Sequence, residues 1–118
     1  MGWLSHPIFS KSGGYPPVMV EAIASNSVRE GRPWSRLPEM SPKIKAYIQG
    51  SADFLGLNYY TSRFVSMNND SSSIVAKNPS WEKDASLNSF IDPSWKRAKS
   101  TWLYSVPQGL GDILRYHA

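Results

Sequence analysis

The 118-residue sequence contains no cysteine, which excludes disulfide bonds and thiolate metal sites. It has only two histidines, His6 and His117, which lie near opposite ends of the chain. Two isolated histidines cannot form a metal site by themselves. The sequence therefore predicts no metal site.

Long hydrophobic runs and basic clusters are also missing. No stretch approaches the roughly 18 apolar residues of a membrane span. The first residues, MGWLSHPIFSKSGG, lack the basic and apolar regions of a signal peptide. The net charge is +4, but the basic residues are scattered, which argues against binding to nucleic acid. We therefore expect no membrane span and no nucleic-acid partner, and the localisation stays unknown.

Aromatic residues, by contrast, are abundant. They make up 13% of the sequence and include five tryptophans and six tyrosines. Aromatic side chains bury large areas in a core, and in a cleft they also stack on flat or ring-shaped ligands. The length suits one modest domain and is too short for two.

Three helices are predicted from apolar spacing and from the residues at their ends. Pro17 suits the first position of a helix, and Gly31 suits its end. A second helix is expected to begin at Ser41-Pro42 and to end near Gly50, and a third to begin near Pro107. The apolar stripes of these helices are Val18, Met19, Ala22 and Ile23; Ile44, Tyr47 and Ile48; and Leu110, Ile113 and Leu114.

The most hydrophobic stretch is residues 53–62, DFLGLNYYTS, which we predict to be a buried strand. One face is apolar and consists of Leu55, Leu57 and Tyr59. The other face consists of Phe54, Gly56, Asn58 and Tyr60, and it becomes polar at Asn58 and Tyr60. Such a strand needs hydrogen-bonded neighbours, and the sequence offers none. The chain is therefore expected to be a piece of something larger, or to pair with another chain.

Residues 66–98 are rich in Asn, Ser and Asp, and we interpret them as one long loop. The loop carries Trp81, Phe90 and Trp95, so it is not expected to be simply disordered. Loops of this length inside a compact domain are more often functional or packed on a neighbour than idle. The opening residues are also read as irregular, with a turn at 12–14.

Three segments resemble glycoside hydrolase family 1, the β-glucosidases with their lactase-like, myrosinase-like and Klotho relatives. They are GWLSHPIFSKSGGYPPVM, RLPEMSPKIKAYIQGSADFLGLNYYTS and WLYSVPQGLGDIL. The segments follow the order of the family and cover nearly the whole chain outside residues 66–98, which are variable in the family. Their details resemble an animal, arthropod-type member.

The resemblance implies an α/β fold, a partial (β/α)8 TIM barrel of which this chain supplies about a quarter. Residues 53–62 would be the sixth barrel strand, and residues 1–118 a fragment of a single barrel domain with the variable loop at 66–98. Barrel enzymes place their chemistry at the carboxyl ends of the strands, lined by inward side chains. Asn58 and Tyr60 occupy that end of the predicted strand.

The resemblance also implies roles for three residues. Tyr60 matches the family residue that hydrogen-bonds the catalytic nucleophile, and Asn58 matches one that lines the glycone pocket beside it. Trp102 matches a tryptophan that forms a platform for the aglycone part of the substrate. From the residues alone, Asn58 and Tyr60 can also be read as satisfied polar groups at a strand end, and Trp102 as a core residue that seats the following helix.

The resemblance assigns no catalytic residue to this chain. Retaining glycosidases need two carboxylates roughly 5 Å apart. The family carries them in T-x-N-E-P and T-E-N-G motifs, and neither motif occurs in this sequence. The nine acidic residues are Glu21, Glu30, Glu39, Asp53, Asp70, Glu82, Asp84, Asp92 and Asp112. Because Asp53 lies at the wrong end of the strand and the others lie on predicted helices, loops or connectors, the chain alone is expected to be inactive.

The leading interpretation is a segment of a retaining β-glycosidase that hydrolyses β-glucoside-type O-glycosyl bonds in carbohydrate metabolism. The resemblance implies that this enzyme works without a metal or cofactor and suggests that it is secreted. One alternative is a non-catalytic pseudoenzyme or Klotho-like interaction protein. Another is an unrelated small α/β domain that completes its sheet by forming oligomers.

Overall fold

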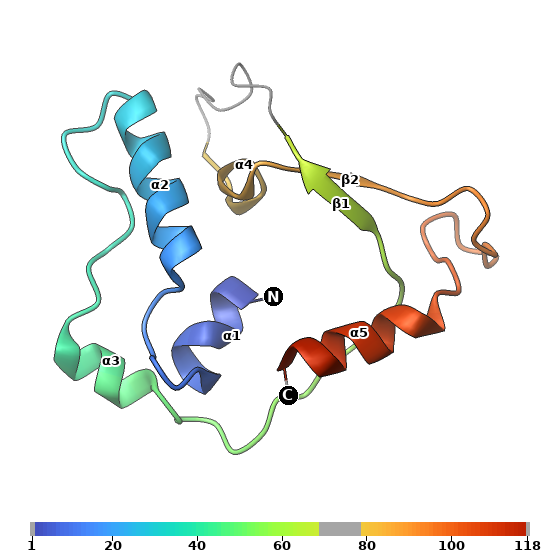
Figure 1. Cartoon of the computed structure of the whole chain (residues 1–118), viewed down its shortest axis with the longest axis horizontal. Coiled ribbons are helices and arrows are strands. Elements are labelled where there is room, and N and C mark those ends of the chain that lie inside the picture. Colours follow the sequence, from blue (N-terminus) through green and yellow to red (C-terminus); the bar gives the residue numbers. More distant parts are fainter. Residues whose placement is uncertain (1, 69–78, 118) are drawn as a thin grey trace. The chain divides into compact units, whose positions relative to one another are not determined.

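The computed structural model describes residues 2–68 and 79–117 and divides into two compact units. The described part of unit 1 consists of residues 2–55 and 79–86, and that of unit 2 of residues 56–68 and 87–117. Unit 1 is made of helices, whereas unit 2 combines a β-hairpin with one helix (Figure 1). No helix in these described ranges is both long enough and apolar enough to cross a membrane.

The helices of unit 1 are α1 (Gly2–Phe9), α2 (Pro17–Arg29), α3 (Pro42–Ile48) and α4 (Trp81–Ala85). Helix α2 begins at Pro17 and stops before Gly31, whose φ of 72° lies in the left-handed region that glycine adopts without strain. Helix α3 follows Ser41, whose hydroxyl accepts a hydrogen bond from the Ile44 N–H at 3.3 Å. The predicted boundaries of both helices are confirmed.

Helix α1 lies where the sequence was interpreted as irregular. Its proline, Pro7, removes only one backbone hydrogen bond. The end of the helix is held from outside, because the Gly50 N–H donates to the Ile8 carbonyl at 2.7 Å and α1 packs on α3. Contacts distant in sequence therefore override the weak local propensity. The predicted turn is confirmed, and Gly13 has a φ of 60° there.

Residues 54–60 form no strand in this structure. The expected two-faced pattern is nonetheless present in the exposure of the side chains. Leu57 and Tyr59 are half-buried, whereas the alternate residues Asn58 and Tyr60 are exposed. The expectation that the whole stretch is buried is not met, and Phe54 is 82% exposed. A strand forms only when neighbours satisfy its backbone groups, and no described segment pairs with this one.

Unit 2 contains a hairpin of two antiparallel strands, β1 (Phe64–Met67) and β2 (Leu87–Phe90). Phe64 lies opposite Phe90, and its ring contacts those of Phe90 and Trp95, with centroids 5.7 and 5.0 Å away. The segment predicted as one long loop, residues 66–98, thus carries the end of β1, all of α4 and all of β2. Its residues 69–78 lie outside the described part of the chain.

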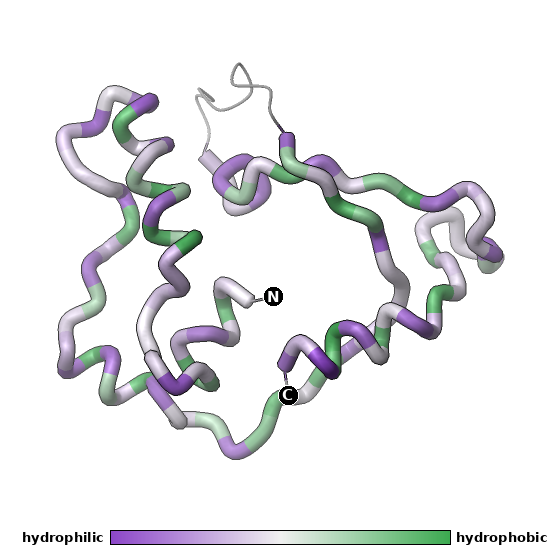
Figure 2. The backbone as a smooth tube through the Cα atoms, viewed as in Figure 1, coloured by the Kyte–Doolittle hydropathy of each residue, from purple (hydrophilic) through white to green (hydrophobic). Residues whose placement is uncertain are grey.

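Helix α5 (Pro107–His117) begins where the sequence predicts, but its apolar stripe is not buried. Leu110 is 39% exposed and Leu114 54%, and hydrophobic and hydrophilic residues alternate along the helix (Figure 2). The stripe of α3 is similarly open, with Tyr47 84% exposed. Ile23 and Val106 are the buried hydrophobic core of the described residues. The described part of the chain therefore has a small core and leaves many large apolar side chains exposed.

Candidate functional site

The three residues with predicted site roles, Asn58, Tyr60 and Trp102, all belong to unit 2. Asn58 is exposed, and its side chain makes no hydrogen bond to another described residue. Tyr60 is 64% and Trp102 53% exposed. Neither aromatic ring is sealed in a core, so both are accessible to a ligand.

Tyr60 and Trp102 are in direct ring contact, which the sequence did not predict. Their ring centroids are 6.2 Å apart and the ring planes meet at 69°, an edge-to-face arrangement that aromatic pairs favour. The two residues are 42 positions apart in the chain, so the fold of unit 2 creates the contact. Together they form an aromatic surface on one unit.

A threonine ties the backbones that carry these two rings. The Thr61 hydroxyl donates to the Tyr104 carbonyl at 3.0 Å and accepts from the Tyr104 N–H at 3.3 Å. Thr61 directly follows Tyr60, and Tyr104 comes two residues after Trp102. The pair of hydrogen bonds thus joins the two segments next to the ring contact.

Tyr59 makes a second tie between the same segments. Its hydroxyl donates to the carbonyl of Val106, the residue before α5, and is 2.7 Å from the Ser62 hydroxyl. Gly109 in the first turns of α5 makes room for this arrangement, because a Cβ there would lie 1.9 Å from Ser62 Oγ and 2.6 Å from Tyr59 Oη. Glycine is thus required for the close approach of α5 to residues 59–62.

Sequence reasoning missed this supporting layer around the site. One signal was available in the helix predicted from Pro107, which has a glycine at 109. A glycine inside a helical pattern lowers helix stability and usually has a packing reason. The hydrogen bonds of Thr61 and Tyr59, in contrast, span more than 40 residues and leave no local pattern.

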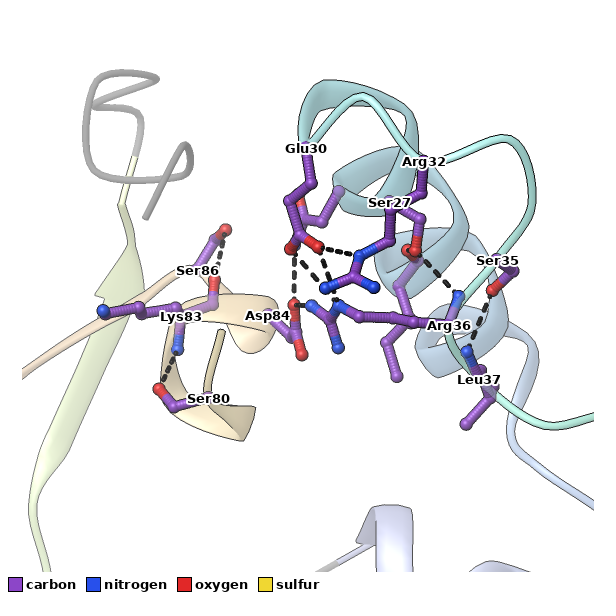
Figure 3. A network of polar contacts seen from close by, with 12 residues as sticks. Ser27, Glu30, Arg32, Ser35, Arg36, Leu37, Ser80, Lys83, Asp84 and Ser86 are labelled. Atoms are coloured by element: carbon purple, nitrogen blue, oxygen red, sulfur yellow. Dashed lines mark hydrogen bonds and ion pairs between the residues drawn. The ribbon is translucent and has the colours of Figure 1, made fainter. Parts of the chain in front are cut away.

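Charged residues form a separate network in unit 1, shown in Figure 3. The nearly buried Asp84 of α4 pairs with the Arg36 guanidinium and accepts a hydrogen bond from the Asn26 amide of α2 at 3.0 Å. The Arg36 Nε lies 3.2 Å from Glu30. Hydrogen bonding to Asp84 raises the pKa of Arg36 above its ordinary value, and hydrogen bonding from Arg32 lowers the pKa of Glu30.

The acidic residues of unit 2 are Asp92 and Asp112 in its described part. Asp92 accepts hydrogen bonds from Ser94, including its backbone N–H at 2.8 Å, and these lower the pKa of the Asp92 carboxyl. Asp112 pairs with Arg115 at 2.6 Å on the surface of α5. A carboxyl group with a lowered pKa is poorly suited to act as a general acid near neutral pH. Among the described residues, no group of three or more histidines or acids could hold a metal ion.

Comparison with known proteins matches residues 1–117 to the model of glycosyl hydrolase family 1. The lactase-like protein of Homo sapiens is 40% identical over 116 residues, which cover 98% of this chain and 20% of that protein. The cytosolic beta-glucosidase of Homo sapiens is 39% identical over 110 residues, covering 93% of this chain and 22% of that protein. Myrosinase 1 of Brevicoryne brassicae is 36% identical over 114 residues, covering 96% and 23%.

A solved structure supports the same relationship. Aphid myrosinase superposes with a TM-score of 0.78 at 35% identity, over 98% of this chain and 23% of that chain. Its family folds as a TIM barrel, so the likeness fits a partial barrel. The chain spans about a fifth of the length of these relatives. Because the family model matches almost every residue, the chain belongs to glycosyl hydrolase family 1.

Proposed function

We propose that this chain is the segment of a retaining β-glycosidase that supports the catalytic nucleophile and offers a platform for the aglycone. The observation that carries the proposal is the contact between Tyr60 and Trp102, two accessible rings in one unit. Both positions match family motifs that surround the scissile bond. The substrates would be β-glucosides or related glycosides.

The chemistry of such an enzyme divides between two carboxylates. One forms a covalent glycosyl-enzyme intermediate, and the other protonates the leaving oxygen and later activates water. The sequence has neither carboxylate motif, so these groups would come from chain outside this segment. Tyr60 would donate a hydrogen bond to the nucleophile carboxylate and thereby favour its charged form. Asn58 would bind sugar hydroxyls, and Trp102 would stack on the aglycone.

The exposure pattern of residues 57–60 supports a place in a barrel wall. In a barrel, one row of side chains faces the interior and the alternate row faces the surrounding helices. Here the half-buried Leu57 and Tyr59 alternate with the exposed Asn58 and Tyr60. This pattern fits the sixth barrel strand that the family resemblance implies for residues 53–62, and we propose that neighbouring strands of the complete domain would pair with it and order it.

A chimera tests the proposal with most of the chain placed in a complete enzyme. In the cytosolic beta-glucosidase of Homo sapiens, the 110 matching residues are replaced by those of this chain, and hydrolysis of 4-nitrophenyl β-glucoside is measured. We expect activity, and we expect Tyr60→Phe to lower kcat/KM by about 10- to 100-fold, the effect of losing a hydrogen bond to a charged group.

Tyr47→Phe is the matched control, because it removes the same hydroxyl group from a tyrosine of α3 that lies outside the proposed site. It should change kcat/KM by less than about twofold. A folded chimera without activity would contradict the proposal and favour a non-catalytic relative. Equal effects of Tyr60→Phe and Tyr47→Phe would contradict the role of Tyr60.

A further inference from the structure

We propose that Thr61 is a positioning residue, whose hydroxyl holds the aglycone platform Trp102 in register with Tyr60. The catalytic meaning of this inference rests on the proposed function. The contact itself is a property of unit 2 and is tested separately below.

Trp102 lies in a short hairpin turn with a well-defined base. Arg97 and Tyr104 form an antiparallel bridge. On either side of it, the Ala98 N–H donates to the Leu103 carbonyl and the Ser105 N–H donates to the Lys96 carbonyl, both at 2.9 Å. We name residues 96–105 the platform hairpin. Because its two arms are bonded to each other, Trp102 moves with the hairpin as a whole.

Thr61 bonds to the base of this hairpin in two ways. A hydroxyl group has one donor proton and can also accept. Thr61 uses both functions on the backbone of a single residue, Tyr104, at 3.0 and 3.3 Å. Two bonds to one peptide backbone restrict both the distance and the tilt of the platform hairpin relative to Tyr60. Removing the hydroxyl removes both bonds.

The Tyr59 tie explains why loss of the Thr61 hydroxyl should act locally. Tyr59 bonds to Val106, just beyond the platform hairpin, and Val106 is almost fully buried. Without the Thr61 hydroxyl, unit 2 remains joined at Val106, and the hairpin gains freedom about that point. The expected consequence is displacement of Trp102 from Tyr60 with the fold retained.

A displaced platform would affect substrates according to their leaving group. An aryl aglycone offers a flat face for stacking on Trp102, whereas a methyl aglycone does not. Thr61→Val should therefore weaken kcat/KM for an aryl β-glucoside more than for methyl β-glucoside. Without Trp102 beside it, the Tyr60 ring would also lose its edge-to-face contact and its fixed orientation. Its hydrogen bond to the charged nucleophile would then weaken, and the pKa of that carboxylate would rise.

The first test measures the contact in the 118-residue chain, without reference to activity. The indole N–H resonance of Trp102 is assigned by its loss in Trp102→Phe, and its shift on loss of the Tyr60 ring is calibrated with Tyr60→Leu. We expect Thr61→Val to move this resonance in the same direction as Tyr60→Leu, and Thr61→Ser to restore it. Thr101→Val is the control, because Thr101 is exposed and its side chain makes no hydrogen bond to another described residue.

An unchanged Trp102 resonance in Thr61→Val would overturn the inference. A Trp102 resonance at its random-coil position in the unsubstituted chain would also overturn it, because the contact would then be absent. A shift of equal size in Thr101→Val would do the same, because the effect would not depend on the Thr61 bonds.

The second test uses the active chimera and separates positioning from general stability. Thr61→Val should lower kcat/KM for 4-nitrophenyl β-glucoside by about fivefold, the effect of one net hydrogen bond. The acid limb of its pH profile should move to higher pH, while Thr61→Ser and Thr101→Val stay near the parent. Equal losses for aryl and methyl glucosides with an unmoved acid limb would contradict the positioning role. An inactive chimera would count against the proposed function and leave the resonance result to decide the inference.

Discussion

Gly109 illustrates how a single residue controls the support of the candidate site. Helix α5 approaches residues 59–62 so closely that a methyl group at position 109 would overlap the Ser62 hydroxyl. Gly111 lies two residues further along the helix. A Cβ added there would have only the flexible Arg115 guanidinium nearby, at 3.4 to 3.8 Å. The two glycines therefore lie in one helix, but a larger side chain would clash with its neighbours at position 109 and not at position 111.

Gly109→Ala should destabilise unit 2 by about 1–3 kcal/mol, because the new Cβ forces α5 away from Tyr59 and Ser62. Gly111→Ala should instead stabilise the chain by about 0.5–1 kcal/mol, because alanine favours a helix over the unfolded chain. Urea unfolding followed by circular dichroism gives both free energies. Equal effects of the two substitutions would show that the close approach at Gly109 does not determine the packing of α5.

At the scale of elements, ion pairs and hydrogen bonds hold helices together where few apolar side chains are buried. Helix α4 has only five residues, too few to be stable by itself. It is fixed to α2 through Asp84, which is 6% exposed and reaches both Arg36 and Asn26. This contact joins α4 to α2 within unit 1.

Asp84→Asn should therefore lower the free energy of unfolding by about 1–3 kcal/mol, because it leaves the mostly buried Arg36 charge with Glu30 as its remaining partner. Asp112→Asn is the matched control. It breaks the Arg115 pair on the surface of α5, where both side chains are more than 70% exposed, and should cost less than about 0.5 kcal/mol. Losses of similar size in urea titrations of the two variants would refute a structural role for the Asp84 contact.

Some of these elements could be predicted from the sequence, and others could not. Helices α2 and α3 carry their own boundary signals, namely prolines at their starts and glycines just beyond their ends, and both were predicted within a residue or two. Helix α4 has a local signal in its N-cap, Ser80, but its attachment to α2 depends on partners distant in sequence, as does the pairing of strands β1 and β2. Residues 53–62 have the composition of a strand but pair with no strand in the described part of the chain.

The candidate site likewise has features that the sequence predicts and features that it does not. Asn58, Tyr60 and Trp102 were found because they lie in motifs that resemble a family. The contact between the two rings, the Thr61 bonds and the space made by Gly109 depend on tertiary structure, and sequence reasoning missed them. A motif predicts which side chains face a substrate, whereas packing decides how they are held.

At the scale of the whole molecule, the exposed apolar stripes and the short match to longer relatives have one explanation. Each relative is about five times as long as the matched segment, and a complete barrel would supply the strands and helices that cover Phe54, Tyr47 and Leu114. The same complete barrel would supply the two carboxylates. Under the proposed function, the chain would contribute supporting side chains to the reaction, and we expect the chain alone to be inactive.

Hydrolysis of 4-nitrophenyl β-glucoside by the 118-residue chain and by the chimera, measured side by side, tests this claim most directly. The account predicts no turnover by the chain alone, because both carboxylate motifs are absent, and clear turnover by the chimera, because its host supplies them. Turnover by the chain alone, or a folded chimera that does not hydrolyse the substrate, would contradict it.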